Sequence, residues 1–580
     1  MAPHLTVDRV EAGNGEVPGR LGRTHPIGAD PVELRSLLRP ASIGAGLSGV
    51  LPEADKRPGI AGTAYDTAWL AAVPVRPGQR ASRFPSSLQW LVDHQSPDGS
   101  WGGEVPYEHD RILSTLASLT ALASFGRRAV DRASVKSGVR YLWQHGHILA
   151  SEPVELVGFE LLLPALIQGA QGAGVPVPPH LDIYGKERAE KLRLIPPAAL
   201  YSPRTTAVHS LEFLGDEADL AGLKAAQGVN GSIGNSPAAT AFFLARRDDE
   251  PALAYLLDCA GRTGDNTVPV LHPCETFELL WAAYHLFLAG VPSAALLTAQ
   301  EQEVLRSSLQ AGGVSLSPTF PIPDADDTAV ALLLLHELGE SMDPGVLQAF
   351  ALPDKHFVSF QHERHSSVGV NLHVLHALLR VPGYPDRDAT VVRLVDYLAE
   401  QQIRGLYWFD KWHISPYYAT AHAIAVLGEL PPHLAPRAAP LIQRSLDWLR
   451  QTQNGDGSWG FYGQPTAEET AYALLGLTAG SQAHVSFTRS EIERVKDVYE
   501  RDRQRCARAE RYLRKLLGPG NWDTERKLPP LWIDKCLYTP TMVVRSAIQA
   551  ARIAYRRAER TRDLGCCGRN RRPGMGSMAS

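Results

Sequence analysis

The sequence lacks an excess of basic residues, a long apolar run and a clustered set of cysteines. Its formal net charge is −4 over 580 residues, which gives no reason to expect a nucleic acid or an anionic membrane surface as a partner. No uninterrupted apolar run approaches the roughly 18 residues of a membrane span. Residues 1–30 carry charges and contain no apolar segment of the signal-peptide type. These features predict a cytoplasmic protein without a membrane span.

Paired cysteines and strand patterns are scarce as well. The six cysteines show no Cys-x-x-Cys spacing, which fits a reducing compartment and argues against structural zinc. Alternation of apolar and polar residues is rare, whereas Ala/Leu-rich segments of about 10 to 18 residues alternate with Gly/Pro loops. Hydrophobic residues make up 44% of the chain, enough for a sizeable core. The sequence therefore predicts an all-α fold.

What the sequence does contain is an internal repeat. Residues 95–102 and 453–460 both begin with Gln and end in Asp-Gly-Ser-Trp-Gly, and residues 227–234 form a third copy with Ile233 in place of Trp. We expect the Gln to hydrogen-bond backbone groups freed at a neighbouring helix end and the Trp to cover the joint between adjacent helices. Repeats of this kind suit a ring of helix pairs.

A second recurring unit, Thr-Ala, opens Ala/Leu-rich segments. It occurs at residues 67–68, 240–241, 328–329, 420–421 and 470–471. Each copy stands near the expected start of a helix, so this unit predicts where the helices of the ring begin.

Three carboxylates lie close together around one of these units, at Asp324, Asp326 and Asp327, directly after a Pro-Ile-Pro segment. Carboxylates this close raise one another's pKa, and a carboxyl that stays neutral at physiological pH can act as an acid. The alternative interpretation is an ordinary acidic helix start. The Glu-Glu-Thr-Ala segment at 468–471 supports that alternative for Asp327. Asp326, supported by Asp324, is then the candidate for acid chemistry.

The Asp-x-Asp-Asp-Thr-Ala stretch and the Gln–Trp repeats together resemble class II terpene cyclases. The closest resemblance is to the diterpene branch, the copalyl diphosphate synthase-like enzymes, in their short bacterial form. Further stretches at 64–69, 203–212, 410–412 and 532–535 carry the same resemblance, in family order.

The resemblance implies an all-α fold of two α-helical double barrels, β and γ, with the active site between them. It places the γ domain at 55–275, inserted into a β domain made of a first helix at 31–54 and residues 276–560. We expect residues 1–30 and 561–580 to be a disordered N-terminus and a disordered tail.

The resemblance also implies roles for individual residues near the acidic cluster. Asp326 matches the general acid that protonates the terminal double bond of a prenyl chain, and Asp324 and Asp327 would position it. Asn371 matches an asparagine that hydrogen-bonds this acid. Two histidine pairs, 362/365 and 373/376, have helical spacing, and we expect them to be ordinary surface or core residues.

Other matches concern the diphosphate and its metal. Lys191 and Lys411 match lysines that bind the substrate's diphosphate, which ammonium groups suit as compact charges. Glu152 and Glu155 match acidic residues that help to hold Mg²⁺, the expected cofactor.

Two further predictions concern the end of the reaction and the walls of the pocket. His209 matches the histidine of a His–Asn pair that holds the deprotonating water, but Val270 stands where the family has the asparagine. The aromatic side chains expected to line the pocket are Trp281, Trp408, Phe409, Tyr417 and Tyr418.

The reaction implied by the resemblance converts geranylgeranyl diphosphate into a bicyclic labdane-related diphosphate of the copalyl, halimadienyl or clerodienyl type. The sequence contains no Asp-Asp-x-x-Asp motif, so the product would keep its diphosphate and a separate class I terpene synthase would act next. The alternatives are a cyclase that makes a drimane-type diphosphate from farnesyl diphosphate, a squalene-type cyclase, a zinc prenyltransferase-like barrel and a non-catalytic helical scaffold. The oligomeric state stays open.

Overall fold

The computed structural model describes residues 47, 59–151, 156–353, 355–361, 363, 366–481, 489–516 and 528–567. The predicted disordered N-terminus and, apart from Leu47, the predicted first helix lie outside these ranges. The prediction of a disordered tail from residue 561 is wrong for its first part, because α21 (Thr541–Cys567) continues through it. Arg, Glu and Ala dominate residues 551–560, and their high helix propensity favours this continuation. Residues 568–580 lie outside the described ranges.

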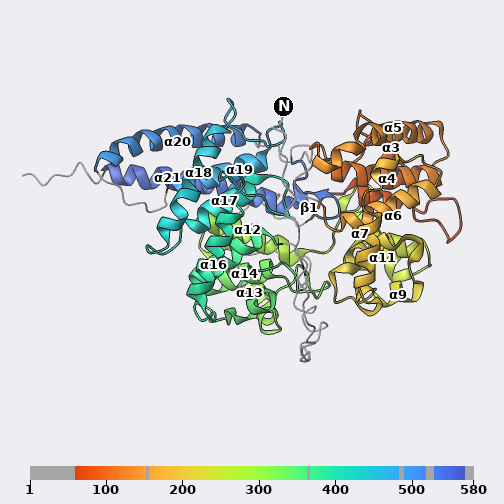
Figure 1. The fold of residues 1–580 in the computed structure, drawn as a ribbon, viewed down its shortest axis with the longest axis horizontal. Helices are drawn as coiled ribbons and strands as arrows, with labels where there is room; N and C mark the ends of the chain where they lie inside the picture. Colours follow the sequence, from red (N-terminus) through yellow and green to blue (C-terminus); the bar gives the residue numbers. More distant parts are fainter. Residues whose placement is uncertain are drawn as a thin grey trace, which may run out of the picture.

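The chain forms two lobes (Figure 1). Each lobe is built on a closed ring of helices that pack in order against one another. In the N-terminal lobe, the inner ring is α2 (Ala64–Ala71), α4 (Glu108–Phe125), α6 (Phe159–Gly172), η5 (Thr206–Glu217) and α10 (Pro237–Leu244). Its outer elements are α3 (Pro85–Asp93), α5 (Ala129–His145), η3 (Gly146–Ser151), η4 (Pro179–Leu181), α7 (Gly185–Leu194), α8 (Pro197–Leu200), α9 (Leu220–Ala225) and α11 (Glu250–Thr263).

The C-terminal lobe follows the same plan with one more element in its inner ring. Its inner ring is α12 (Glu275–Leu288), α14 (Ala325–His336), α15 (Val368–Arg380), α17 (Pro416–Leu427), α19 (Ala467–Gly480) and α21, which closes against α12. Its outer elements are η6 (Ser293–Ala295), α13 (Ala299–Gln310), η7 (Pro344–Phe350), α16 (Arg387–Glu400), α18 (Ala435–Gln451) and α20 (Arg489–Leu516).

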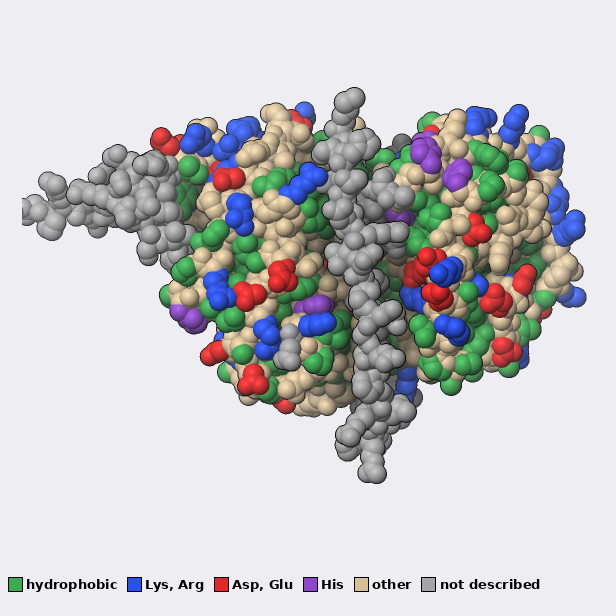
Figure 2. Space-filling view, viewed as in Figure 1, with side chains coloured by type: hydrophobic (Ala, Val, Ile, Leu, Met, Phe, Trp, Pro, Cys, Tyr) green, Lys and Arg blue, Asp and Glu red, His purple; other side chains and the backbone are tan. Residues whose placement is uncertain are grey.

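Within the described residues, the regular strands are limited to one short antiparallel pair, β1 (Trp532–Ile533) and β2 (Leu537–Tyr538). The predicted all-α fold is confirmed. No helix in the described ranges is long and apolar enough to cross a membrane. Acidic and basic side chains are interspersed over both lobes on the face shown in Figure 2, as expected from the small net charge.

The two repeated motifs form one structural unit. The backbone N–H of Trp459 donates to the hydroxyl of Thr470, at 3.1 Å, and the indole N–H of Trp459 donates to the carbonyl of Leu449, at 2.9 Å. The Gln453 amide donates to the carbonyl of Arg505, at 3.1 Å. The Gln–Trp motif thus joins inner helix α19 to outer helices α18 and α20. The threonine of the Thr-Ala motif accepts the hydrogen bond from the Trp backbone.

The same contact recurs around both rings. A threonine hydroxyl in the first half of an inner helix accepts a backbone N–H. The donor is the residue at the Trp position of the repeat, or its equivalent, which we call the plug position. The pairs are Trp101 with Thr115, Ile233 with Thr240, Val314 with Thr328, and Trp408 with Thr420. Gln95 and Gln453 donate to carbonyls inside outer helices α5 and α20, not at helix ends as the sequence predicted. Gln227 donates instead to the carboxylate of Asp249, the cap of α11. The ring is therefore held by side chains that satisfy backbone groups across each joint.

The β1–β2 hairpin connects the two lobes. On one side, its backbone pairs with residues 412–414 of the C-terminal lobe through Ile414 N–H to Leu531 O and Ile533 N–H to Trp412 O, both 2.9 Å. At its tip, Asp534 and Lys535 enter the N-terminal lobe. The carbonyl of Asp534 accepts the N–H of Val157, at 3.1 Å. The lobes are therefore joined by hydrogen bonds, and the hairpin lies at their boundary.

Glu278 at the start of α12 is a further polar group that is buried at this boundary, in addition to Lys535. Its side chain accepts the N–H of Gly59, at 2.8 Å, and burial raises its pKa from 4.5 to about 8. The folded protein therefore holds this proton more tightly than the unfolded chain. Its contribution to the free energy of unfolding is complete below pH 4.5 and is lost as the pH rises toward about 8.

We expect Glu278→Gln to flatten the pH dependence of stability. The amide stays neutral and still accepts the N–H of Gly59. The free energy of unfolding of the variant, minus that of the wild type, should therefore rise by on the order of 3 kcal/mol between pH 4.5 and pH 8. Denaturant titrations across this range measure the effect. The control is Glu250→Gln, at an exposed position on α11. A Glu278→Gln curve parallel to the wild type would contradict the prediction.

Candidate active site

The acidic cluster lies at the N-terminus of inner helix α14. Asp324 is the cap residue, and its carboxylate accepts the N–H of Asp327, at 2.7 Å. The sequence assigned the helix-start role to Asp327, whereas the structure gives the capping bond to Asp324. On α19, Thr466 and Glu469 make the equivalent cap. Asp326 and Glu468 then occupy the same position on their helices.

Burial and repulsion hold protons on this cluster. Burial is the largest cause that raises the pKa of Asp327 well above its ordinary value, and Asp324 and Asp326 add to it. Burial likewise raises the pKa of Asp324, while the N–H of Asp327 opposes the rise. Since Asp327 Oδ2 is buried without a partner in the described structure, a charge on this carboxyl would be costly.

Asp326 makes a different contact from its neighbours. Its Oδ1 lies 2.6 Å from Nδ1 of His373 on α15, the adjacent inner helix. Burial raises the pKa of Asp326 above its ordinary value, and His373 acts in the opposite direction. Its side chain is 12% exposed, while that of His373 is fully buried. Asp326 thus combines a pKa raised by burial, one fixed oxygen and residual access, which suits a Brønsted acid.

The predicted contact between Asn371 and Asp326 is wrong. The Asn371 amide donates to the carbonyls of Phe357 and Ser367, at 2.9 and 2.7 Å, and its oxygen accepts the N–H of Phe357, at 2.8 Å. Both amide hydrogens are therefore used. His373, two residues along α15, points to the other side of the helix and contacts the acid. The expectation that His373 is an ordinary core residue is wrong as well.

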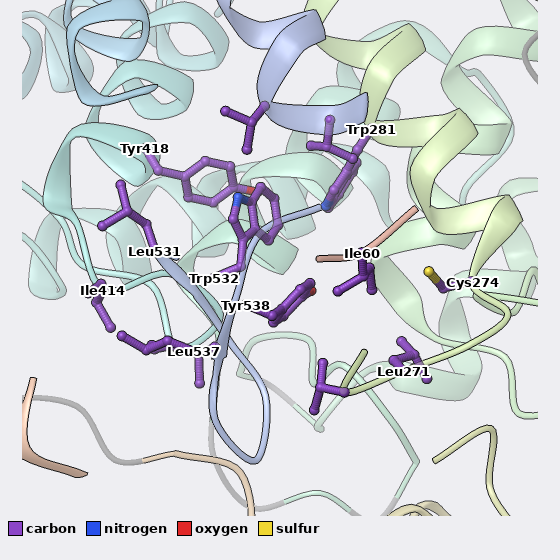
Figure 3. Close-up of a cluster of buried hydrophobic side chains, with 14 of the residues drawn as sticks. Ile60, Leu271, Cys274, Trp281, Ile414, Tyr418, Leu531, Trp532, Leu537 and Tyr538 are labelled. Carbon is purple, nitrogen blue, oxygen red and sulfur yellow. The ribbon is translucent and has the colours of Figure 1, made fainter. Parts of the chain in front are cut away.

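Aromatic rings pack against His373, and further rings form a cluster nearby. The Trp281 ring centroid lies 4.7 Å from that of His373, and the Tyr418 ring lies 5.2 Å from Trp532. In Figure 3, the β1–β2 segment carries Trp532 and Tyr538 between Tyr418 and Trp281. Aromatic faces stabilise a cation beside them. An acid in this environment can create positive charge on an apolar substrate and have that charge stabilised.

Three of the predicted pocket aromatics serve the helix rings instead. Trp408 is a plug residue, with its indole N–H bound to the carbonyl of Leu398, at 2.7 Å. Tyr417 stacks on Trp448, at 4.7 Å, and Phe409 packs against Phe461. Trp408 and Tyr417 thus contact outer helices α16 and α18, while Phe409 and Phe461 lie between helices. Trp281 and Tyr418 are the predicted residues that the structure brings to the aromatic cluster, and Trp532 is one that the sequence did not single out for it.

This chain is similar to known proteins over most of its length. The family model described as "Squalene-hopene cyclase C-terminal domain" matches residues 362–512. The "Type B diterpene cyclase" of Mycobacterium tuberculosis is 32% identical over 523 residues, which cover 85% of this chain and 95% of the relative. The "Ent-copalyl diphosphate synthase" of Streptomyces sp. (strain KO-3988) is 32% identical over 85% of this chain and 92% of its own length.

The chain belongs to the class II diterpene cyclase family. Among solved structures, ent-copalyl diphosphate synthase from Streptomyces platensis has a TM-score of 0.68 and 28% identity, covering 90% of this chain and 99% of that one. The resemblance inferred from the sequence is confirmed, and this cyclase is an enzyme of the class that begins its reaction by protonation.

Both lysines expected to bind diphosphate are in ion pairs in this cyclase. Lys191 on α7 pairs with Glu160, and its side chain is 46% exposed. Lys411 pairs with Glu363 and lies over the ring of Trp412, 4.5 Å from its centroid. Lys411 also acts on the pKa of Asp326, which places its charge near the acid. A bound diphosphate would compete with these carboxylates for the ammonium groups.

The expected Mg²⁺ ligands Glu152 and Glu155 lie outside the described residues. Within the described ranges, no group of three or more His, Cys, Asp or Glu side chains could hold a metal ion. The expectation of Mg²⁺ therefore stays a prediction.

His209 does not have the geometry of a base. Its Nδ1 lies 2.9 Å from the carbonyl of Gly234, and its Nε2 lies 3.1 Å from a carboxylate oxygen of Asp534. Although burial acts to raise it, the contact with His209 keeps the pKa of Asp534 below its ordinary value. Both ring nitrogens of His209 therefore have protein partners, and neither is left to hold a water. His209 therefore serves the junction between the lobes.

Proposed function

We propose that this cyclase converts geranylgeranyl diphosphate into a bicyclic labdane-related diphosphate. The observation that carries the proposal is the buried Asp326, whose pKa is raised by burial, held against His373 beside aromatic rings. The printed names of the relatives support the substrate class, since they include ent-copalyl and labda-7,13-dienyl diphosphate synthases.

In this proposal, Asp326 transfers its proton to the terminal double bond of the prenyl chain. The resulting cation is attacked by the next double bonds, which closes two rings. Trp281, Tyr418 and Trp532 stabilise the positive charge and keep water away. Loss of a proton from the final cation restores a double bond, so that substrate and product are isomers. Asp326 must regain a proton before the next turnover.

The diphosphate is proposed to bind Lys191 and Lys411, displacing Glu160 and Glu363 from them. Mg²⁺ is proposed to accompany it and would neutralise part of its charge. Addition of a chelator tests the role of the metal. Because the sequence has no Asp-Asp-x-x-Asp motif, the product should keep the diphosphate, and an enzyme that ionises it would act next.

The cytoplasm is the proposed compartment. Cys259, Cys274 and Cys536 are buried and form no disulfide, as expected where thiols stay reduced.

The test is incubation of the purified cyclase with geranylgeranyl diphosphate, farnesyl diphosphate or squalene, each with Mg²⁺. Products are dephosphorylated where needed and identified by gas chromatography–mass spectrometry and NMR. We expect a bicyclic C20 alcohol from geranylgeranyl diphosphate. If only farnesyl diphosphate or only squalene gives a cyclised product, that compound is the substrate in place of geranylgeranyl diphosphate. If none of the three gives a cyclised product, the proposed function is refuted.

A further inference from the structure

We propose that His422 is a positioning residue that fixes the tautomer of His373 and thereby decides which oxygen of Asp326 carries the reactive proton. This inference rests on the proposed function, in which Asp326 is the acid. His422 lies on α17 and is separated from Asp326 by the His373 ring.

Three consecutive inner helices each contribute one member of a linear chain. Oδ1 of Asp326 on α14 lies 2.6 Å from Nδ1 of His373 on α15. Nε2 of the same ring lies 3.0 Å from Nδ1 of His422 on α17. Both histidines are buried, at 1% exposure each. Each ring nitrogen of His373 therefore faces one fixed partner, and water does not compete for either.

The chain admits two arrangements of protons when both rings are neutral, because a neutral imidazole has one donor and one acceptor nitrogen. In the first, Asp326 donates from Oδ1 to His373, which donates from Nε2 to His422. His422 then carries its own hydrogen on Nε2. In the second, His422 donates from Nδ1, His373 donates from Nδ1, and Asp326 Oδ1 accepts.

The far nitrogen of His422 distinguishes the two arrangements. His422 Nε2 is buried and has no hydrogen-bond partner within the described structure. The first arrangement would leave an N–H there without an acceptor, and buried N–H groups without partners are rarer than buried acceptors without them. The second arrangement leaves only a lone pair at this atom. The geometry therefore favours donation toward Asp326.

The surroundings of His422 keep its ring neutral. The rings of His285, Tyr284, Tyr418 and Tyr472 lie with their centroids 4.5 to 6.0 Å from that of His422. Burial, followed by the neighbouring histidines, holds the pKa of His422 well below its ordinary value. A neutral His422 ring has one N–H, and Nε2 of His373 is the atom that accepts it.

The consequence concerns the acid. When Oδ1 accepts from His373, the proton that Asp326 retains must be on Oδ2. The same N–H stabilises the carboxylate that forms as the proton leaves. His422 thus keeps the reactive proton off Oδ1 of Asp326. A proton on Oδ1 would face His373 and could not reach a substrate.

Two nearly isosteric variants separate this role from packing. In His422→Asn, the side-chain amide can place an N–H near the former Nδ1, so we expect a kcat within about fivefold of the wild type. In His422→Asp, the carboxyl draws a proton onto Nε2 of His373, which then holds protons on both nitrogens and traps Asp326 as a carboxylate. We expect kcat to fall at least about 100-fold with KM unchanged. Equal kcat values for two folded variants would overturn the proposal.

A direct measurement covers the case in which His422→Asp does not fold. Neutron diffraction from deuterated wild-type crystals locates each proton of the chain without reference to activity. We expect deuterium on Nδ1 of His422, on Nδ1 of His373 and on Oδ2 of Asp326. Deuterium on Nε2 of His373 would overturn the proposal. If the wild type cyclises none of the three substrates, the proposed function fails, whereas the neutron result still decides the tautomer.

Discussion

Asp326→Asn is expected to lower the turnover of geranylgeranyl diphosphate on the order of 1000-fold or more while the protein stays folded. An amide has no acidic proton to give to a double bond, and general acid catalysis contributes about 100- to 10,000-fold in rate. The amide oxygen can still accept from Nδ1 of His373, so the contact made by Oδ1 survives. The loss should appear in kcat, because the diphosphate is proposed to bind Lys191 and Lys411 and not Asp326.

The control for this variant is Asp219→Asn. Asp219 caps α9 in the N-terminal lobe at an exposed position, and asparagine caps a helix about as well as aspartate. Its kcat should match the wild type. Product formation by gas chromatography–mass spectrometry and folding by circular dichroism are measured for both variants. An Asp326→Asn protein with a kcat within tenfold of the wild type would show that another group supplies the proton.

Lys535→Met is expected to lower the free energy of unfolding by about 3 to 5 kcal/mol. The Lys535 ammonium is fully buried and donates to the carbonyl of His209, at 2.9 Å, to Glu212, at 2.8 Å, and to the hydroxyl of Ser236. All three acceptors belong to the N-terminal lobe, whereas Lys535 belongs to the hairpin that pairs with the C-terminal lobe. Its loss leaves a buried carboxylate at Glu212 without its cation.

A double-mutant cycle isolates that cause. Glu212→Gln removes the negative charge, so the Lys535→Met, Glu212→Gln protein should be more stable than the sum of the two single effects predicts. Lys186→Met, at an exposed surface pair, should change stability by less than about 0.5 kcal/mol. Chemical denaturation followed by tryptophan fluorescence gives the free energies. Strict additivity in the cycle would show that the two charges do not act on each other.

The repeats were readable in the sequence because they are local. The Gln and Trp positions recur at the same spacing in each copy, and Thr-Ala units recur near helix starts, since each copy closes a similar joint between helices. Their partners, such as Thr470 for Trp459 and Arg505 for Gln453, became known only from the structure. Trp408 shows the resulting ambiguity, because an aromatic plug and a pocket wall look alike in a sequence.

The acid itself was predicted because its neighbours along the chain reveal it. Asp324, Asp326 and Asp327 crowd one helix start, and the Glu468–Glu469 counterpart separated the capping role from the chemical one. Which of the flanking aspartates makes the cap was not readable, since it depends on a backbone N–H within hydrogen-bond distance.

The partners of the acid were decided by the tertiary structure alone. Every residue of α15 from Val368 to Leu378 is buried, so no periodicity distinguishes the face that carries Asn371 from the face that carries His373. His373 and His422 are 49 residues apart and meet only because α15 and α17 are neighbours in the ring. The sequence thus determined the fold class, the repeat and the acid, because these depend on local pattern. The packing of neighbouring inner helices in the closed ring determined which side chains contact that acid.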